Sequence, residues 1–150
     1  MLPVADDHVP SAVPPHPVRP PHVRLGVLAE GGLAPAILAI VERGVGRRPA
    51  LAAGVRAEVV LEFAEGYPPV RVVFDDRHVL VEDGPAAAPD LRVSGTLPDL
   101  VSLMMTPHLG GLPNPIAARG RAALGMIALR RVQIQGRLGL LRRLLRVIAV

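Results

Sequence analysis

The stretch Arg131-Val-Gln-Ile-Gln-Gly-Arg-Leu-Gly-Leu-Leu-Arg-Arg-Leu-Leu-Arg-Val147 decides how this chain folds, because its hydrophobic period changes at one glycine. Before Gly136, Val132 and Ile134 alternate with glutamines, as in a strand with one covered face. After Gly136, the period becomes that of a cationic amphipathic helix. Its apolar positions are Leu138, Leu141, Leu144, Leu145 and Ile148, and its opposite arc carries Arg142, Arg143 and Arg146. The stretch predicts a domain whose last strand and helix close an apolar interior.

The composition limits the core and the chemistry. The chain has 150 residues, enough for one domain with a sizeable core. Half of the residues are hydrophobic but only 2% are aromatic, so the core must be aliphatic. The absence of cysteine excludes disulfides, thiolate metal sites and cysteine nucleophiles. The net charge is +4, and every basic residue is arginine. High genomic GC content is the first explanation of this arginine usage, and the basic balance could also favour an anionic membrane surface or an acidic partner.

The first residues do not have the pattern of a targeting segment. Asp6 and Asp7 stand where a signal peptide carries positive charge, and prolines interrupt its apolar run. Apolar runs elsewhere are broken before the roughly 20 residues of a spanning helix. We therefore expect a cytoplasmic protein. The prolines predict an extended, disordered arm over residues 1–24 and a folded domain over residues 25–150.

The middle of the chain predicts one helix followed by strands. Apolar spacing favours a helix over Leu33–Val45 and a short helical turn over Pro49–Ala53. Alternating residues then predict four strands, at Val55–Phe63, Val70–Phe74, His78–Glu82 and Leu91–Ser94. Because tight turns join such strands, we expect an antiparallel meander.

The next segment predicts two more helices. Thr96-Leu-Pro-Asp99 matches a capping box and begins a helix that Pro107 stops. His108–Pro113 is expected to be a loop, and Asn114-Pro115 to cap another helix. Ile116, Gly120, Ala123, Leu124 and Ile127 would align on that helix. With the closing strand and helix, the order predicts an α+β domain whose five strands form a sheet covered on one face.

This order and two motifs resemble the lipid-binding domain of the sterol carrier protein family. The first motif is Ala88-Pro-Asp-Leu-Arg-Val-Ser-Gly95, followed by a helix from Pro98 to Met105. The second and more specific motif is Val132-Gln-Ile-Gln-Gly-Arg-Leu-Gly-Leu-Leu141. The likeness covers about residues 33–148. It implies a five-stranded, largely antiparallel sheet whose helices enclose an apolar tunnel or cavity for sterols, fatty acids or acyl chains.

Inward faces of these strands and helices are the candidate lining of such a cavity. The candidates are Phe63, Phe74, Leu100, Leu103, Met104, Met105, Ile134, Leu141 and Leu145. Met104 and Met105 suit ligands of irregular shape because their thioethers are flexible. For any one of these residues taken singly, ordinary core packing is the favoured explanation. As a set without large aromatics to fill space, they indicate an apolar cavity.

Signals for catalysis are weak. Asp75, Asp76 and His78 lie at a hairpin turn, where aspartate is favoured for its backbone hydrogen bonds. The serines have no histidine or acid at a recognisable spacing, and the glycines form no phosphate-binding loop. The five histidines are scattered. We expect neither an enzyme, nor a metal site, nor a cofactor.

Arginine pairs raise two further possibilities. Arg47-Arg48, Arg130-Arg131 and Arg142-Arg143 could hold nucleic-acid phosphates, but stacking aromatics are missing, so we expect no nucleic-acid partner. Arg142, Arg143 and Arg146 could instead contact an anionic membrane or a protein partner from the last helix. That helix is either a lid over the cavity or simply a docked amphipathic helix.

The sequence therefore predicts a non-catalytic intracellular carrier for an apolar lipid, gated by its last helix. The alternative is an accessory or scaffold protein of the same fold. Some members of the family that the chain resembles serve quinone-synthesis enzymes, and such a protein would use its surface for protein partners.

Overall fold

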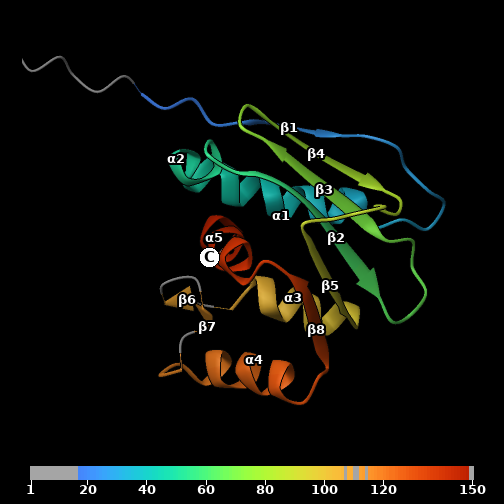
Figure 1. The fold of residues 1–150 in the computed structure, drawn as a ribbon, viewed down its shortest axis with the longest axis vertical. Coiled ribbons are helices and arrows are strands. Elements are labelled where there is room, and N and C mark those ends of the chain that lie inside the picture. Colours follow the sequence, from blue (N-terminus) through green and yellow to red (C-terminus); the bar gives the residue numbers. More distant parts are fainter. Residues whose placement is uncertain (1–16, 107, 110–111, 114, 149–150) are drawn as a thin grey trace, which may run out of the picture.

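A mixed sheet with helices against one face organises the chain (Figure 1). The computed structural model describes residues 17–106, 108–109, 112–113 and 115–148. Its helices are α1 (Ala34–Arg47), α2 (Pro49–Ala52), α3 (Leu97–Met104), α4 (Ala118–Ala128) and α5 (Leu138–Ile148). The strands of the main sheet are β1 (His22–Leu25), β2 (Arg56–Phe63), β3 (Val70–Asp75), β4 (His78–Asp83), β5 (Leu91–Gly95) and β8 (Val132–Gly136). The α+β class is confirmed.

The strand order corrects the predicted sheet. In the described residues, the order is β1-β4-β3-β2-β5-β8, so the sheet has six strands rather than five. The β1–β4 and β2–β5 pairs are parallel, and the other three pairs are antiparallel. The predicted four-strand meander is therefore limited to β2, β3 and β4. The fourth strand, β5, lies on the far side of β2, because residues 84–90 form a connection long enough to cross the sheet rather than a tight turn.

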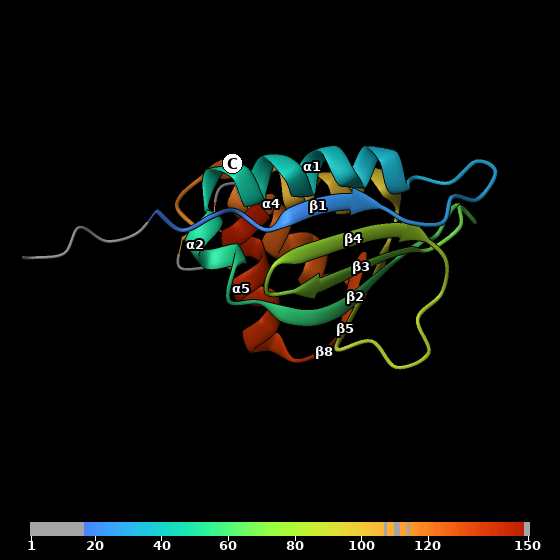
Figure 2. The same ribbon diagram turned by 90° about the horizontal axis from the view of Figure 1, so that it is seen from above.

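The extra strand lies partly within the predicted arm. β1 pairs with β4 in the register Val23↔Val79, so residues 22–24 belong to the sheet. Residues 1–16 lie outside the described residues. A four-residue strand next to prolines has too little alternation to be recognised in sequence, and its pairing with β4 comes from main-chain hydrogen bonds. Figure 2 shows β1 along the edge beside β4.

The alternation of the three consecutive strands is confirmed and positions the core. Val59, Leu61, Val72 and Phe74 are buried and face α1, α3 and α5 across the core. Glu58, Arg71 and Glu82 belong to the opposite face, since successive strand residues alternate. The main core therefore lies between one face of the sheet and these three helices.

The predicted cap of α3 is also confirmed. The Thr96 side chain accepts a hydrogen bond from the backbone N–H of Asp99 at 3.3 Å. The Asp99 side chain is buried and does not complete a reciprocal capping box. One of its carboxylate oxygens instead pairs with Arg131 at 2.9 Å. This ion pair ties the start of α3 to the residue that precedes β8.

Two later elements differ from the expectation. The predicted loop His108–Pro113 contains two short paired strands, β6 (His108–Leu109) and β7 (Leu112–Pro113). The helix expected after Asn114 begins only at Ala118, and Asn114 itself lies outside the described residues. Ile116, which was expected to align on that helix, precedes it and is 81% exposed.

A buried carboxylate joins the end of β4 to the start of α1. The Asp83 side chain accepts hydrogen bonds from the backbone N–H groups of Ala29 at 3.1 Å and Ala34 at 3.0 Å. These bonds fold the connection between β1 and α1 back onto the sheet. Ala34 N–H belongs to the first turn of α1, where backbone donors lack helical partners.

We expect Asp83→Ala to lower the free energy of unfolding by about 2–3 kcal/mol, because two backbone donors lose their charged acceptor. Urea unfolding followed by circular dichroism measures this change. Asp90→Ala is the control, since Asp90 also accepts a backbone N–H bond, from Glu58, but is exposed. An equal loss for both variants would contradict the role of burial.

Candidate functional site

An aliphatic pocket lies between the sheet and three helices. Its floor is the inner face of β2, β3 and β5, and its walls come from α1, α3 and α5. The lining residues are Ile37, Val41, Val59, Leu61, Val72, Phe74, Leu91, Val93, Leu100, Leu103, Met104, Leu141, Leu144, Leu145 and Ile148. Every one of these side chains is apolar, so the pocket can hold a molecule by burial and offers it no side-chain hydrogen bond.

The volume of this pocket is small. It is about 60 Å³, whereas sites for small molecules usually measure about 300–1,000 Å³. The tunnel implied by the sequence resemblance is therefore not open at this position in the structure. A sterol or an acyl chain would fit only if the surrounding elements moved apart.

Six of the nine predicted lining residues meet in the pocket. They are Phe74, Leu100, Leu103, Met104, Leu141 and Leu145. The other three lie elsewhere. Phe63 is buried at the end of β2, where its ring packs edge-on against Tyr67 with centroids 6.2 Å apart. Ile134 is half-buried on the edge strand β8, and Met105 is 38% exposed on the other side of α3.

Most of the lining residues that were not predicted come from α1 and the strands. Ile37 and Val41 belong to the apolar face of α1, and Val59 and Val72 to the alternating strand faces. The periodicity of the sequence identifies each of these faces as buried. It does not say which part of a buried face lies under which helix, so it could not select these positions.

Helix α5 closes the pocket through a close approach to α1. A Cβ atom added to Gly44 would lie 2.6 Å from the carbonyl oxygen of Val147, so only glycine permits this spacing. The Arg48 guanidinium donates a hydrogen bond to the carbonyl oxygen of Arg146. The inward leucines of α5 thus form one wall of the pocket while its end packs on the last turn of α1.

The predicted contact residues of α5 lie outside the pocket. Arg142, Arg143 and Arg146 are all exposed, on the arc opposite Leu141, Leu144 and Leu145. The Arg143 guanidinium reaches the backbone at Gly54, just after α2. The cationic face of α5 therefore continues toward α2 and the end of α1, which carries Arg47 and Arg48.

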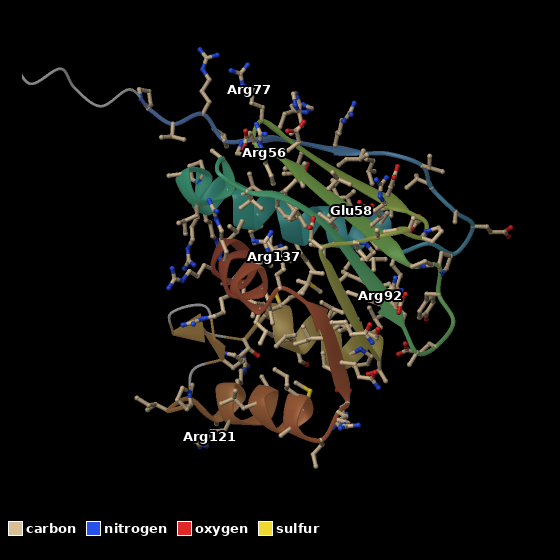
Figure 3. The ribbon with its side chains drawn as sticks, in the orientation of Figure 1. Arg56, Glu58, Arg77, Arg92, Arg121 and Arg137 are labelled. Carbon is tan, nitrogen blue, oxygen red and sulfur yellow. The ribbon has the colours of Figure 1, made fainter. Side chains whose placement is uncertain are left out.

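Charge on the far face of the sheet is mostly paired. Arg71 on β3 binds Glu58 at 2.5 Å and Glu82 at 2.6 Å, and both hydrogen bonds raise the pKa of Arg71 above its usual value. Arg92 pairs with Glu62. Figure 3 labels Glu58 on β2 and Arg92 on β5, together with Arg56 at the start of β2. Among the described residues, ion pairs therefore neutralise much of the charge on this face.

The hairpin residues considered for catalysis form a turn. Asp76 has a φ of 30° and pairs with Arg56 at 2.5 Å, which lowers the pKa of Asp76. His78 is exposed at the start of β4. In the described residues, we find no group of three or more side chains that could hold a metal ion. None of the described helices has the length and apolar content needed to cross a membrane.

Comparisons with known proteins identify the architecture. No protein-family model and no curated protein matches the sequence. A solved structure titled "UbiJ-SCP2 Ubiquinone synthesis protein" aligns over 77% of this chain and 88% of its own length, with 18% identity and a TM-score of 0.56. Sterol Carrier Protein 2 Like 2 from Aedes aegypti aligns over 73% of this chain and 96% of its own, with 18% identity and a TM-score of only 0.38. On the strength of the first alignment, this chain has the fold of a sterol carrier protein-like domain.

Proposed function

We propose that this domain is a non-catalytic binding protein for an apolar lipid, such as a sterol, a fatty acid or an acyl chain. The observation that carries the proposal is the pocket lined entirely by apolar side chains from the sheet and three helices. Each CH₂ group moved from water into such a pocket contributes about 0.8 kcal/mol. Affinity would come from burial, and selectivity from the shape that the aliphatic walls adopt.

The mechanism includes an outward movement of α5. A pocket of about 60 Å³ must expand to take an acyl chain. The strands are held by main-chain ladders, whereas the inward face of α5 is held by apolar side-chain packing. Moving α5 therefore costs less than opening the sheet, and it exposes Leu141, Leu144 and Leu145 to the incoming ligand. In this proposal α5 is the gate.

Native mass spectrometry of the purified protein, followed by organic extraction, tests the proposal. We expect a stoichiometric apolar ligand, or tight binding of a dansyl-labelled undecanoate by the emptied protein. An apo mass together with absence of probe binding would reject the carrier function. A cytoplasmic location, expected from the sequence, stays a prediction.

We further propose that the arginines of α5 contact an anionic membrane when the gate opens. Replacing Arg142 and Arg143 by glutamine is expected to weaken binding to phosphatidylserine vesicles roughly thirtyfold at low salt, since each arginine near such a surface contributes about 1 kcal/mol. Vesicle co-sedimentation measures the change. Arg24→Gln with Arg77→Gln is the matched control, because these exposed arginines lie on β1 and in the β3–β4 turn. Equal weakening by both pairs would contradict a specific contact through α5.

The second candidate is an accessory protein in quinone metabolism. The small size of the core pocket favours this candidate. Quinone metabolism is suggested by the structural neighbour that is described as a ubiquinone synthesis protein. Here the fold would present a surface to protein partners. A ligand-free protein that co-purifies with an enzyme of quinone synthesis would support this candidate over the carrier.

A further inference from the structure

A second groove lies on the side of α3 that faces away from the core pocket. Leu100, Leu103 and Met104 of α3 line the core pocket, whereas Ser102, Met105 and Thr106 line this groove. Its other wall is α4, through Arg119, Ala122 and Met126. The groove has a volume of about 280 Å³, larger than the core pocket. Helix α3 thus separates two distinct cavities.

The spacing of the lining residues explains why the groove is continuous. Arg119, Ala122 and Met126 stand at positions i, i+3 and i+7 of α4, so they form one ridge along that helix. Buried Gly120 and Ala123 lie beside this ridge, where α4 approaches the rest of the protein. Because those two side chains are absent or small, α4 can lie close to the protein body, with the ridge at the edge of the groove.

The groove combines apolar walls with one unpaired cation. Met105 and Met126 supply flexible thioethers, which adapt to an irregular apolar chain. The Thr106 hydroxyl donates its hydrogen bond to the backbone carbonyl of Ser102, so this donor is not available to a ligand. Among the described residues, the Arg119 side chain makes no hydrogen bond or ion pair. A guanidinium at the rim of an apolar groove is the arrangement that binds a carboxylate with an apolar tail.

The distribution of charge along the chain supports an anionic ligand. Residues 1–99 contain 9 arginines and 13 acidic residues, whereas residues 100–150 contain 8 arginines and no acidic residue. The two parts therefore carry −4 and +8. Asp99, the acidic residue that directly precedes this acid-free segment, is paired with Arg131. The segment that forms α4 thus supplies no carboxylate of its own to compete for Arg119.

We propose that the α3–α4 groove is a second binding site, separate from the core pocket, for an amphipathic carboxylate of the fatty-acid class. The apolar tail lies against Met105, Ala122 and Met126, and the carboxylate accepts hydrogen bonds from Arg119. The site does not depend on movement of α5. Binding in the groove therefore does not require lipid binding in the core pocket.

The methionines provide a direct test, because the chain has four and they occupy different places. Met104 reports on the core pocket, Met105 and Met126 report on the groove, and Met1 reports on the N-terminus. The full chain is labelled with ¹³C at the methionine methyl groups, and each signal is assigned by Met→Leu substitution. Decanoate is then titrated, with uncharged decanol as the comparison.

We expect saturable shifts of the Met105 and Met126 signals with decanoate. Arg119→Gln should weaken this binding about three- to fivefold, since Arg119 is exposed, and leave decanol binding unchanged. Arg121→Gln is the matched control on α4, because Arg121 does not line the groove and donates to the carbonyl oxygen of Ile116. Ala122→Phe should fill the exposed groove without disturbing the core, and so abolish the Met126 shift.

Three outcomes would overturn the second site. Decanoate that moves only the Met104 signal places all binding in the core and leaves the proposed carrier function standing. Shifts of equal size at Met1 and Met126 indicate non-specific association. No shift of any methionine rejects the groove and also counts against lipid binding in the core.

Discussion

Replacing Leu145 by arginine is expected to lower the affinity for dansyl-labelled undecanoate at least a hundredfold. Leu145 is 5% exposed and lines the core pocket together with Leu141. An arginine at this position places a cation among apolar side chains, and an unpaired buried charge costs several kcal/mol. The side chain must either fill the pocket or hold α5 away from it, and either result removes the apolar site. Fluorescence titration measures the affinity.

Leu138→Arg is the matched control for this change. It adds the same charge to the same helix, but Leu138 is 65% exposed and does not line the pocket. We expect its affinity to remain close to that of the unmodified protein. If Leu145→Arg fails to fold by circular dichroism, Met104→Gln places an uncharged polar group in the same pocket, and a loss of about tenfold is expected. Unchanged affinity in a folded Leu145→Arg or Met104→Gln protein would refute the site.

Gly136→Ala is expected to lower the free energy of unfolding by about 3 kcal/mol or more, for two combined reasons. Gly136 ends β8 with a φ of 121°, which side-chain-bearing residues rarely adopt. A Cβ atom there would also collide with the backbone carbonyl oxygen of Asp90 on the chain entering β5. Relief of that collision requires β8 to separate from β5, where Leu91 pairs with Gly136.

Gly139→Ala provides the opposite expectation three residues later. Gly139 lies in the first turn of α5, and a Cβ atom there meets nothing within 4 Å. Alanine should therefore stabilise the protein by up to about 1 kcal/mol, because it favours the helix more than glycine does. Urea unfolding of both variants measures the contrast. A similar effect of the two substitutions would contradict the close approach at Gly136.

Features that are set by residues close together in the sequence were predicted correctly, whereas pairings between distant segments were not. The helical period of α1, the alternation of β2, β3 and β4, and the Thr96 cap are set by neighbours within a few residues, and all are confirmed. The position of β5 was wrong, because its pairing with β2 is chosen across a long connection. Helix α4 was poorly bounded because its residues have only a weak division into apolar and polar faces.

The same reasoning separates the predicted site residues from one another. Met104 and Met105 are adjacent, apolar and similar in sequence, yet one lines the core pocket and the other lines the α3–α4 groove. Successive residues of a helix point in directions about 100° apart around its axis, so the two side chains meet different neighbours. Which side of α3 is covered by which element depends on helix packing, and no local pattern contains that information.

By itself, the sequence determined an aliphatic core, the order of most elements and the closing strand and amphipathic helix. These follow from residue chemistry and from the periods of helix and strand, which act over short distances. The tertiary structure alone decided the six-stranded mixed order, the small size of the core pocket and the groove between α3 and α4. These depend on how distant segments pack against one another, since a cavity is the space that packed elements leave between them.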